Sequence, residues 1–284
     1  MAHAEFVVAP SNTEQARAWD GDEGRYWADH ADQFDASLRA YQPIFMSAAA
    51  LADGDTVLDV GCGTGQCSIE AARKVGGGEV LGVDLSEVML EVARRRARAA
   101  GMANVSFVKG DAQVHPFAPR AFDAVIGRTS VMFFGDPAAG LGNLFAALRP
   151  GGRLVLLVWQ PLERNEWLQC ILGALAAGRD LPAPPSGAPG PFALSRPALV
   201  RELLAGAGFR RPDLQDLERP MCLGSTAEDA TAFIHGLNAW MLRGLGDAEQ
   251  ARALDALAET MHEHETGRGV EFASAMWLVT ASRP

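Results

Sequence analysis

Short apolar runs alternate with amphipathic stretches through the middle of the chain. The runs are rich in β-branched residues and bounded by glycines or acids, which is typical of buried strands in a parallel sheet. They lie at residues 56–60, 80–83, 105–108, 122–127 and 153–159. Between them, apolar residues recur at helical spacing, as over 66–74 and 87–100. This alternation predicts an α/β fold with a doubly wound sheet.

A helical pattern precedes the first of these strands. It contains Trp19, Tyr26 and Trp27 among acids and alanines. Such a segment can fold over the open end of a sheet and exclude water from a ligand, although an aromatic stripe can equally be plain core. We therefore expect residues 1–55 to form an N-terminal helical cap, whose aromatic residues lie either over a ligand or in the core.

Beyond Trp159 the pattern is less regular. It predicts helices at 165–177 and 195–207, a linker at 181–191, and extended segments at 213–223 and 271–282. Residues 225–264, between the extended segments, are helical, and we expect this insertion to roof a substrate pocket. The chain thus divides into a cap at 1–55, a core at 56–160 and the rest of the same domain at 161–284.

The first strand ends in a glycine-rich loop. Asp59 is followed closely by Gly61, Gly63 and Gly65, and then by a predicted helix. Glycines let the backbone turn tightly and approach a ligand, and the N-terminus of the helix presents free N–H groups to it. Alone this loop is a weak signal, because dinucleotide-binding folds use a related one.

The next two strands also end near an acidic residue, Asp84 and Asp111. A carboxylate at the position of Asp84 can accept both hydroxyls of an adenosine ribose. Together with Asp59, these acids suit a cationic nucleoside without phosphate, since they would repel a pyrophosphate. The expected ligand is S-adenosylmethionine.

In this order and spacing, VLDVGCGTG, GVDLS, KGDA, FDAVIGR and LRPGGRLVLLVW resemble the class I S-adenosylmethionine-dependent methyltransferases over about residues 56–159. The segment around Trp19, Gly24 and Tyr26 is similar to the cap of the small-molecule branch related to the quinone-biosynthesis C-methyltransferases. The resemblance implies a Rossmann-like sheet of seven strands, mostly parallel with an antiparallel last strand. It also implies a methyltransferase activity (EC 2.1.1.-).

The resemblance implies roles for the residues at the strand ends. Asp59 and the glycine loop would hold the methionine end of the cofactor, Asp84 the ribose, and Asp111 with Ala112 the adenine edge. Arg128 is either a clamp for a substrate carboxylate or a partner for one of the three acids, and we favour the second. The expected cofactor-binding residues are Trp19, Tyr26, Trp27, Asp59, Gly61, Cys62, Gly63, Gly65, Gln66, Asp84, Leu85, Met89, Gly110, Asp111, Ala112 and Arg128.

Substrate contacts are expected after the fourth and fifth strands and in the insertion. The candidates are Thr129, Ser130, Met132, Phe133, Trp159, His235, Asn238 and Trp240. Methyl transfer from a sulfonium depends mainly on positioning, and a base is needed only for a protonated nucleophile. His235 is the candidate base.

Charge and composition limit the classes of molecule that the protein can bind. A net charge of -10 argues against nucleic acid, and no apolar run approaches the roughly 18 residues that span a bilayer. The N-terminus lacks a basic signal-peptide region. We expect a soluble, cytoplasmic enzyme of small-molecule metabolism without a membrane partner, and a homodimer is left open.

No metal is expected. The four cysteines have no repeated metal spacing and are read as reduced structural residues. His262 and His264 lie two positions apart in a predicted helix, where they do not share a face.

The functional reading is a methyltransferase acting on a small, largely apolar metabolite, with an O-, N- or C-acceptor undecided. An alternative is a protein that binds S-adenosylmethionine for a non-methylating reaction. A nicotinamide-dependent oxidoreductase is a further alternative, opposed by the lack of a Tyr-x-x-x-Lys pair.

Overall fold

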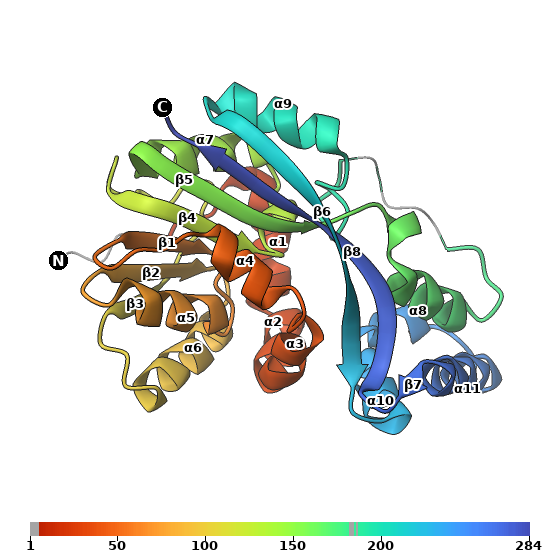
Figure 1. Cartoon of the computed structure of the whole chain (residues 1–284). Helices are drawn as coiled ribbons and strands as arrows, with labels where there is room; N and C mark the ends of the chain where they lie inside the picture. The colour runs from red at the N-terminus through yellow and green to blue at the C-terminus, as the bar shows by residue number, and fades with distance from the viewer. Residues whose placement is uncertain (1–5, 182–184, 186) are drawn as a thin grey trace.

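One mixed sheet runs through the molecule, with strand order β3-β2-β1-β4-β5-β8-β6 (Figure 1). The structure is a computed structural model that describes residues 6–181, 185 and 187–284, so part of the predicted linker at 181–191 and the first five residues lie outside it. The strands are β1 (Thr56–Val60), β2 (Glu79–Asp84), β3 (Val105–Lys109), β4 (Phe122–Arg128), β5 (Leu148–Trp159), β6 (Arg210–Gly224), β7 (Glu265–Thr266) and β8 (Gly269–Ser282). The pairs among β1 to β5 are parallel, and β8 is antiparallel to both β5 and β6.

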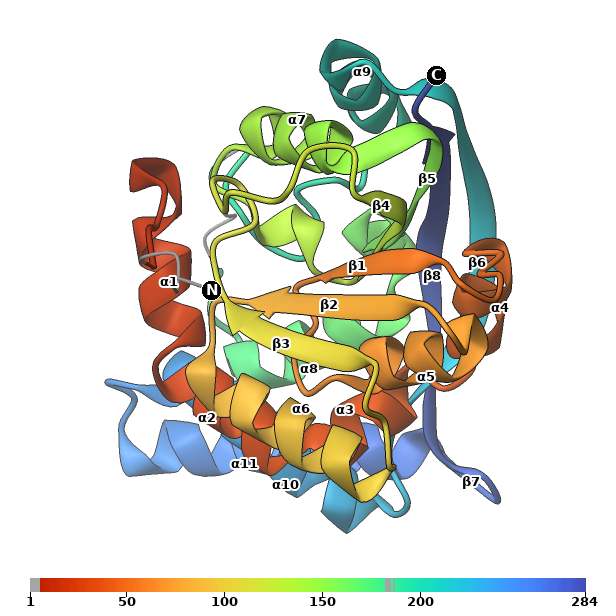
Figure 2. The same ribbon diagram turned by 90° about the vertical axis from the view of Figure 1, so that its left-hand side faces the viewer.

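Helices cover both faces of this sheet. Figure 2 shows α4, α5 and α6 on one side, and α7 and α9 on the other. The α-helices are α1 (Thr13–Trp19), α2 (Asp22–Asp29), α3 (Ala31–Ser37), α4 (Gln42–Ala48), α5 (Gln66–Val75), α6 (Glu87–Ala99), α7 (Pro137–Ala147), α8 (Glu166–Ala176), α9 (Pro197–Ala207), α10 (Ala227–Leu237) and α11 (Asp247–Glu263). Short 3-10 helices are η1 (Pro10–Asn12), η2 (Val131–Phe133), η3 (Leu162–Arg164) and η4 (Ala239–Leu242).

Local signals explain where several helices begin and end. The side chains of Ser86 and Asp136 accept hydrogen bonds from the first turns of α6 and α7, and Pro197 opens α9. Gly208 ends α9 with a φ of 101°, a left-handed conformation that glycine adopts without a steric penalty. These polar and glycine positions are why the sequence pattern located the helices well.

The predicted fold class is confirmed, with one difference in the strand count. The sheet has eight strands where seven were expected, because the two-residue β7 pairs with the start of β8. Two residues are too few to show an alternating pattern. The N-terminal helices and the helices between β6 and β8 are present as expected.

Strands β6 and β8 continue beyond the end of β5 as a two-stranded ribbon (Figure 1). Trp159 at the end of β5 pairs with Met276, and the part of β8 before this point pairs with β6. Helices α8, α10 and α11 pack around the ribbon, and Ile171 of α8 and Leu257 of α11 are fully buried there. Both residues belong to the same hydrophobic core as the central strands, so these helices extend that core.

The N-terminal segment lies against the carboxyl edge of the parallel strands. The Ala9 N–H donates to Asp111, and Lys109 at the end of β3 pairs with Asp20 at 2.7 Å. The Gly135 N–H donates to Asn12. Among the described residues, none of the helices is both long and apolar enough to cross a membrane.

Candidate active site

A cavity lies at the carboxyl edge of the sheet, under the N-terminal helices. Its walls come from the ends of β1, β2, β3 and β4 and from α1, α2 and α3. Most of the residues expected from the sequence line it, namely Trp19, Trp27, Asp59, Gly61, Cys62, Gly63, Gln66, Asp84, Leu85, Met89, Gly110, Asp111, Ala112, Arg128, Thr129, Ser130 and Phe133. Residues from four separate strand ends thus meet in one place.

The glycine loop after β1 has a backbone that side chains would disturb. Gly61 has a φ of 62°, and a Cβ on it would lie 2.4 Å from the Cβ of Ser130. Gly65 has a φ of 86° and would meet Ala93 of α6 at 2.8 Å. Gly65 is also the N-cap of α5, whose first N–H groups are free for a ligand. Gly65 itself does not line the cavity.

Asp59 is almost completely buried at the end of β1. Its side chain is 1% exposed and accepts a hydrogen bond from the Ser68 hydroxyl at 2.6 Å. Burial raises the pKa of its carboxyl group to about 6, against the opposing effects of Ser68 and of the positive charge of Arg128. A buried carboxyl group with this pKa gains a favourable interaction when a cation binds beside it.

Asp84 holds two backbone segments together at the end of β2. Its two carboxylate oxygens accept hydrogen bonds from Gly63 N at 2.8 Å and from Ser86 N at 2.9 Å. Burial raises the pKa of this carboxyl group, and the backbone hydrogen bonds oppose that effect. Since a carboxylate has about four acceptor positions, ligand hydroxyls can still bind to it.

Asp111 accepts more hydrogen bonds from within the protein than Asp59 or Asp84. One of its oxygens accepts from Gln113 N, the other accepts from Ala9 N at 3.0 Å, and the Gln113 side-chain amide lies within 3.3 Å of both. A ligand amino group would have to share these oxygens. Asp111 therefore also fixes the start of the N-terminal segment over the cavity.

Arg128, at the end of β4, points toward the N-terminal helices. It donates to Asp35 of α3 at 3.1 Å and to Gln42 at 2.8 Å, and it also reaches Gln66. Arg96 of α6 donates to Asp35 from the other side at 2.8 Å. The acid paired with Arg128 is thus Asp35 in the cap, whereas we expected a strand-end acid.

The aromatic residues of the cap divide into two groups. Trp19 and Trp27 line the cavity and make edge contacts with each other and, through Trp19, with Phe133 at a ring distance of 5.1 Å. Tyr26 does not line it. The Tyr26 hydroxyl donates to Phe233 O at 2.6 Å, and burial raises its pKa to about 12.

The insertion residues lie away from the cavity. His235 is exposed on α10, Trp240 is 61% exposed, and the Asn238 amide donates to Ile234 O near the end of α10. The geometry therefore does not support a catalytic base at His235. The helical periodicity identified a helix here, but it does not tell which element the helix packs against.

Two other expected substrate contacts belong to the core. Met132 is 1% exposed, and Trp159 packs against Trp167 at a ring distance of 5.1 Å. Both lie near strand ends, but neither lines the cavity. Strand-end position alone does not decide on which side of a loop a side chain lies.

Several lining residues were not expected. They are Asn12, Phe34, Asp35, Leu38, Val60, Thr64, Cys67 and Val83. Phe34 and Leu38 are one helical turn apart, so their spacing could have marked a buried face. No sequence pattern marked Asp35 as a site residue, because its partner Arg128 lies 93 residues away in the sequence.

Comparison with known proteins shows the family of the chain. The methyltransferase domain family matches residues 57–152. The demethylmenaquinone methyltransferase of Thermus thermophilus is 36% identical over 168 residues, which cover 54% of this chain and 73% of that protein. The aklanonic acid methyltransferase DauC of Streptomyces sp. (strain C5) is 42% identical over 102 residues, which cover 36% of this chain and 46% of that protein.

A solved structure extends the similarity to the whole fold. The phosphoethanolamine N-methyltransferase 2 of Haemonchus contortus has a TM-score of 0.60 at 18% identity, covering 98% of this chain and 61% of that one. The chain belongs to the S-adenosylmethionine-dependent methyltransferases. It is a transferase of class EC 2.1.1.-, and its cofactor is S-adenosyl-L-methionine.

Proposed function

We propose that this enzyme methylates a small, largely apolar metabolite in the cavity at the carboxyl edge of the sheet. The observation that carries the proposal is the division of the cavity into two kinds of wall. Buried carboxylates, Asp59 and Asp84, lie at the strand ends, whereas rings such as Trp19, Trp27 and Phe133 lie on the side of the cap and of the loop after β4. The first wall suits a cation and the second an apolar acceptor.

The residues present fit the cofactor. A side chain at residue 61 would clash with Ser130, so glycine keeps this part of the loop open for a ligand. The N-terminus of α5, after the same loop, presents free N–H groups. In the proposed arrangement the Asp59 side of the loop holds the methionine end, Asp84 the ribose hydroxyls, and Asp111 the adenine edge. When bound, S-adenosylmethionine supplies a methyl group already activated by the positive sulfonium.

The chain contributes mainly by positioning and by excluding water. Among the described residues that line the cavity there is no histidine or lysine, so no strong base faces it. Holding an acceptor in line with the methyl group can lower a barrier by up to about 7 to 11 kcal/mol. Trp19, Trp27 and the rings around them would keep the acceptor dry.

The relatives support a small-molecule acceptor. Two of them are named for demethylmenaquinone and aklanonic acid, and Trp19, Trp27, Phe133 and Phe134 give the cavity an apolar wall. The acceptor atom is not part of the proposal. A cytoplasmic location, a homodimer and the absence of a nucleic-acid partner are likewise proposals carried over from the sequence.

The test is transfer of labelled methyl from S-adenosylmethionine into an extract separated into small molecules, protein and nucleic acid. We expect label in the apolar small-molecule fraction, and we expect calorimetry to show binding of S-adenosylmethionine and no binding of NAD. Label in RNA or DNA alone would contradict the proposed acceptor class. Tight cofactor binding without transfer to any fraction would favour the non-methylating alternative.

A further inference from the structure

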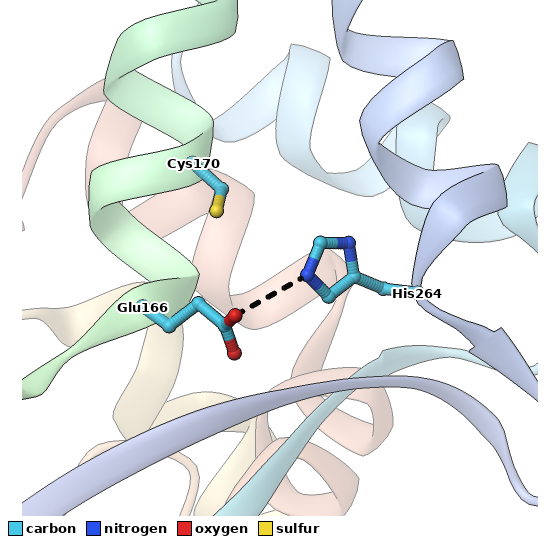
Figure 3. A group of neighbouring side chains, drawn as sticks. All are labelled: Glu166, Cys170 and His264. Carbon is cyan, nitrogen blue, oxygen red and sulfur yellow. Dashed lines mark ion pairs between the residues drawn. The ribbon is translucent and has the colours of Figure 1, made fainter.

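Three side chains that commonly bind metals meet between two helices around the ribbon (Figure 3). Glu166 and Cys170 are one turn apart on α8, and His264 directly follows α11. A carboxylate oxygen, the sulfur and a ring nitrogen all lie within 4.8 Å of one another. None of the three lines the cavity, so this cluster is separate from the candidate active site.

The ring of His264 is held in one orientation. Its Nδ1 lies 2.8 Å from Thr260 O, and because a carbonyl can only accept, Nδ1 carries the proton. The ring also stacks on the buried Phe272 at a centroid distance of 3.9 Å. Nε2 is therefore left without a proton in the neutral ring and faces Glu166, as Figure 3 shows. A histidine whose other nitrogen is fixed by a carbonyl is the usual form of a metal ligand.

Glu166 is oriented as well. One carboxylate oxygen accepts a hydrogen bond from Ala273 N at 2.8 Å, and the other lies 3.6 Å from His264 Nε2. That distance is longer than a hydrogen bond but matches two ligands on one ion. In a tetrahedral zinc site with bonds of about 2.0 to 2.3 Å, ligand atoms are roughly 3.3 to 3.6 Å apart.

The charge around the cluster favours a cation. The thiol of Cys170 is partly buried, and the negative charges of Glu166 and Glu263 both act on it. Nε2 of His264 and Oε1 of Glu166 face each other at 3.6 Å, and one metal ion between them would use the lone pairs of both. The same ion would also use the sulfur of Cys170, which lies within 4.8 Å of both atoms.

We propose that α8 and α11 are joined by a zinc ion bound by Glu166 Oε1, Cys170 Sγ and His264 Nε2, with water as the fourth ligand. Imidazole with thiolate selects zinc over magnesium or calcium, which prefer oxygen ligands. The sulfur lies within 4.8 Å of the other two ligand atoms, so it would have to move closer to them for all three to bind one ion. The ion would fix the end of α11, in the insertion, to α8.

The test uses the tag-free full chain, first stripped with a chelator. We expect zinc to bind at one ion per chain in calorimetry, and cobalt to give the charge-transfer absorption of a thiolate ligand. Cys170→Ser and His264→Gln should each weaken zinc binding at least tenfold and, for Cys170→Ser, remove that absorption. Glu166→Gln keeps the acceptor for Ala273 N, so it provides a milder third variant.

Matched controls separate a built site from general metal affinity. His262→Gln removes an exposed histidine two positions away, and Cys222→Ser removes a partly buried thiol in β6. Both should bind zinc like the unchanged chain. Equal binding by all variants, or no one-to-one binding by a chain that circular dichroism shows to be folded, would overturn the proposal. S-adenosylmethionine affinity should stay within about twofold in every variant, so this test does not depend on the proposed acceptor.

Discussion

Two buried carboxyl groups, Asp59 and Asp84, lie within one cavity and have pKa values raised by burial. Hydrogen bonds partly offset the cost of burying each charge. The donor is the Ser68 hydroxyl for Asp59, and backbone N–H groups for Asp84. A group that is costly to bury and is not fully paired is common at functional sites. The two acids should therefore respond differently to pH and to substitution.

The affinity for S-adenosylmethionine should depend on pH through Asp59. Its carboxyl pKa is about 6, so below pH 6 it is increasingly protonated and loses its attraction for the positive ammonium and sulfonium groups. We expect affinity measured by calorimetry to fall by up to about tenfold per pH unit between pH 6 and pH 5. Asp59→Asn should bind more weakly at pH 7.5 and lose this slope. A slope that persists in the variant would assign the effect to another group.

The same group affects stability with the opposite sense. The pKa of Asp59 is higher in the folded than in the unfolded chain, so protonation of Asp59 stabilises the folded state. This stabilisation is fully present below about pH 4 and is lost as the pH rises through about 6. Asp59→Asn removes this penalty at neutral pH. We expect its free energy of unfolding at pH 8, from urea denaturation without cofactor, to exceed that of the unchanged chain by about 1 to 3 kcal/mol.

Asp84→Asn should reduce both cofactor affinity and stability. The amide cannot accept from both Gly63 N and Ser86 N, and leaving one unpaired costs about 1 to 3 kcal/mol. Loss of hydrogen bonds to ribose should also weaken cofactor binding roughly ten- to hundredfold. Asp123→Asn is the matched control, because Asp123 is buried and accepts from Thr56 N at the opposite end of β1. It should lose stability but keep cofactor affinity, and a comparable affinity loss there would refute the specific role of Asp84.

At the scale of elements, α3 is attached to the core by charge. Asp35 lies between Arg128 of β4 and Arg96 of α6, and the side chains of Asp35 and Arg128 are only 15% and 14% exposed. Its neighbour Asp32 also pairs with Arg96 but is fully exposed. The attachment of the cap thus depends on Asp35, and the exposed Asp32, three positions earlier in the sequence, contributes little.

Asp35→Asn should loosen the cap. A hydrogen bond to a charged group contributes about 1.5 to 3 kcal/mol, and Arg128 would lose its only charged partner among its hydrogen bonds in the described chain. We expect faster hydrogen exchange in α1 to α3, followed by mass spectrometry. Asp32→Asn should change exchange little, because an exposed ion pair contributes about 0 to 1 kcal/mol. Equal exchange in the two variants would show that the aromatic contacts hold the cap.

The regular elements could be predicted from the sequence because their signals are local. The run before Gly61, the Ser86 cap and Gly208 each act within a few residues. The contacts that shape the cavity are not local, as with Asp35 and Arg128. The exposed position of His235 was missed for the same reason, since a helical pattern does not tell where a helix docks.

At the scale of the whole molecule, the N-terminal cap and the helical insertion pack together. The Tyr26 hydroxyl of α2 donates to Phe233 O of α10, and Phe34 of α3 contacts the Phe233 ring at 4.8 Å. The cap and the insertion are therefore one packed unit, although 207 residues separate Tyr26 from Phe233.

Tyr26→Phe tests this packing without touching the cavity. It leaves Phe233 O without this donor, and we expect the free energy of unfolding to fall by about 0.5 to 1.5 kcal/mol. Cofactor affinity should remain within about twofold, because Tyr26 does not line the cavity. An affinity loss larger than the stability loss would instead place the Tyr26 hydroxyl in the cofactor site.

The contact between Tyr26 and Phe233 also has a consequence for folding of the chain during its synthesis on the ribosome. Translation at about 5 to 20 residues per second needs roughly 10 to 40 seconds to make the 207 residues between them. During that time β1 to β5 and the glycine loop can already form, while the cap has no insertion to pack against. The nascent chain thus carries a complete set of strand ends long before Phe233 is made, and until then Tyr26 and Phe34 lack the contacts that join the cap to the insertion.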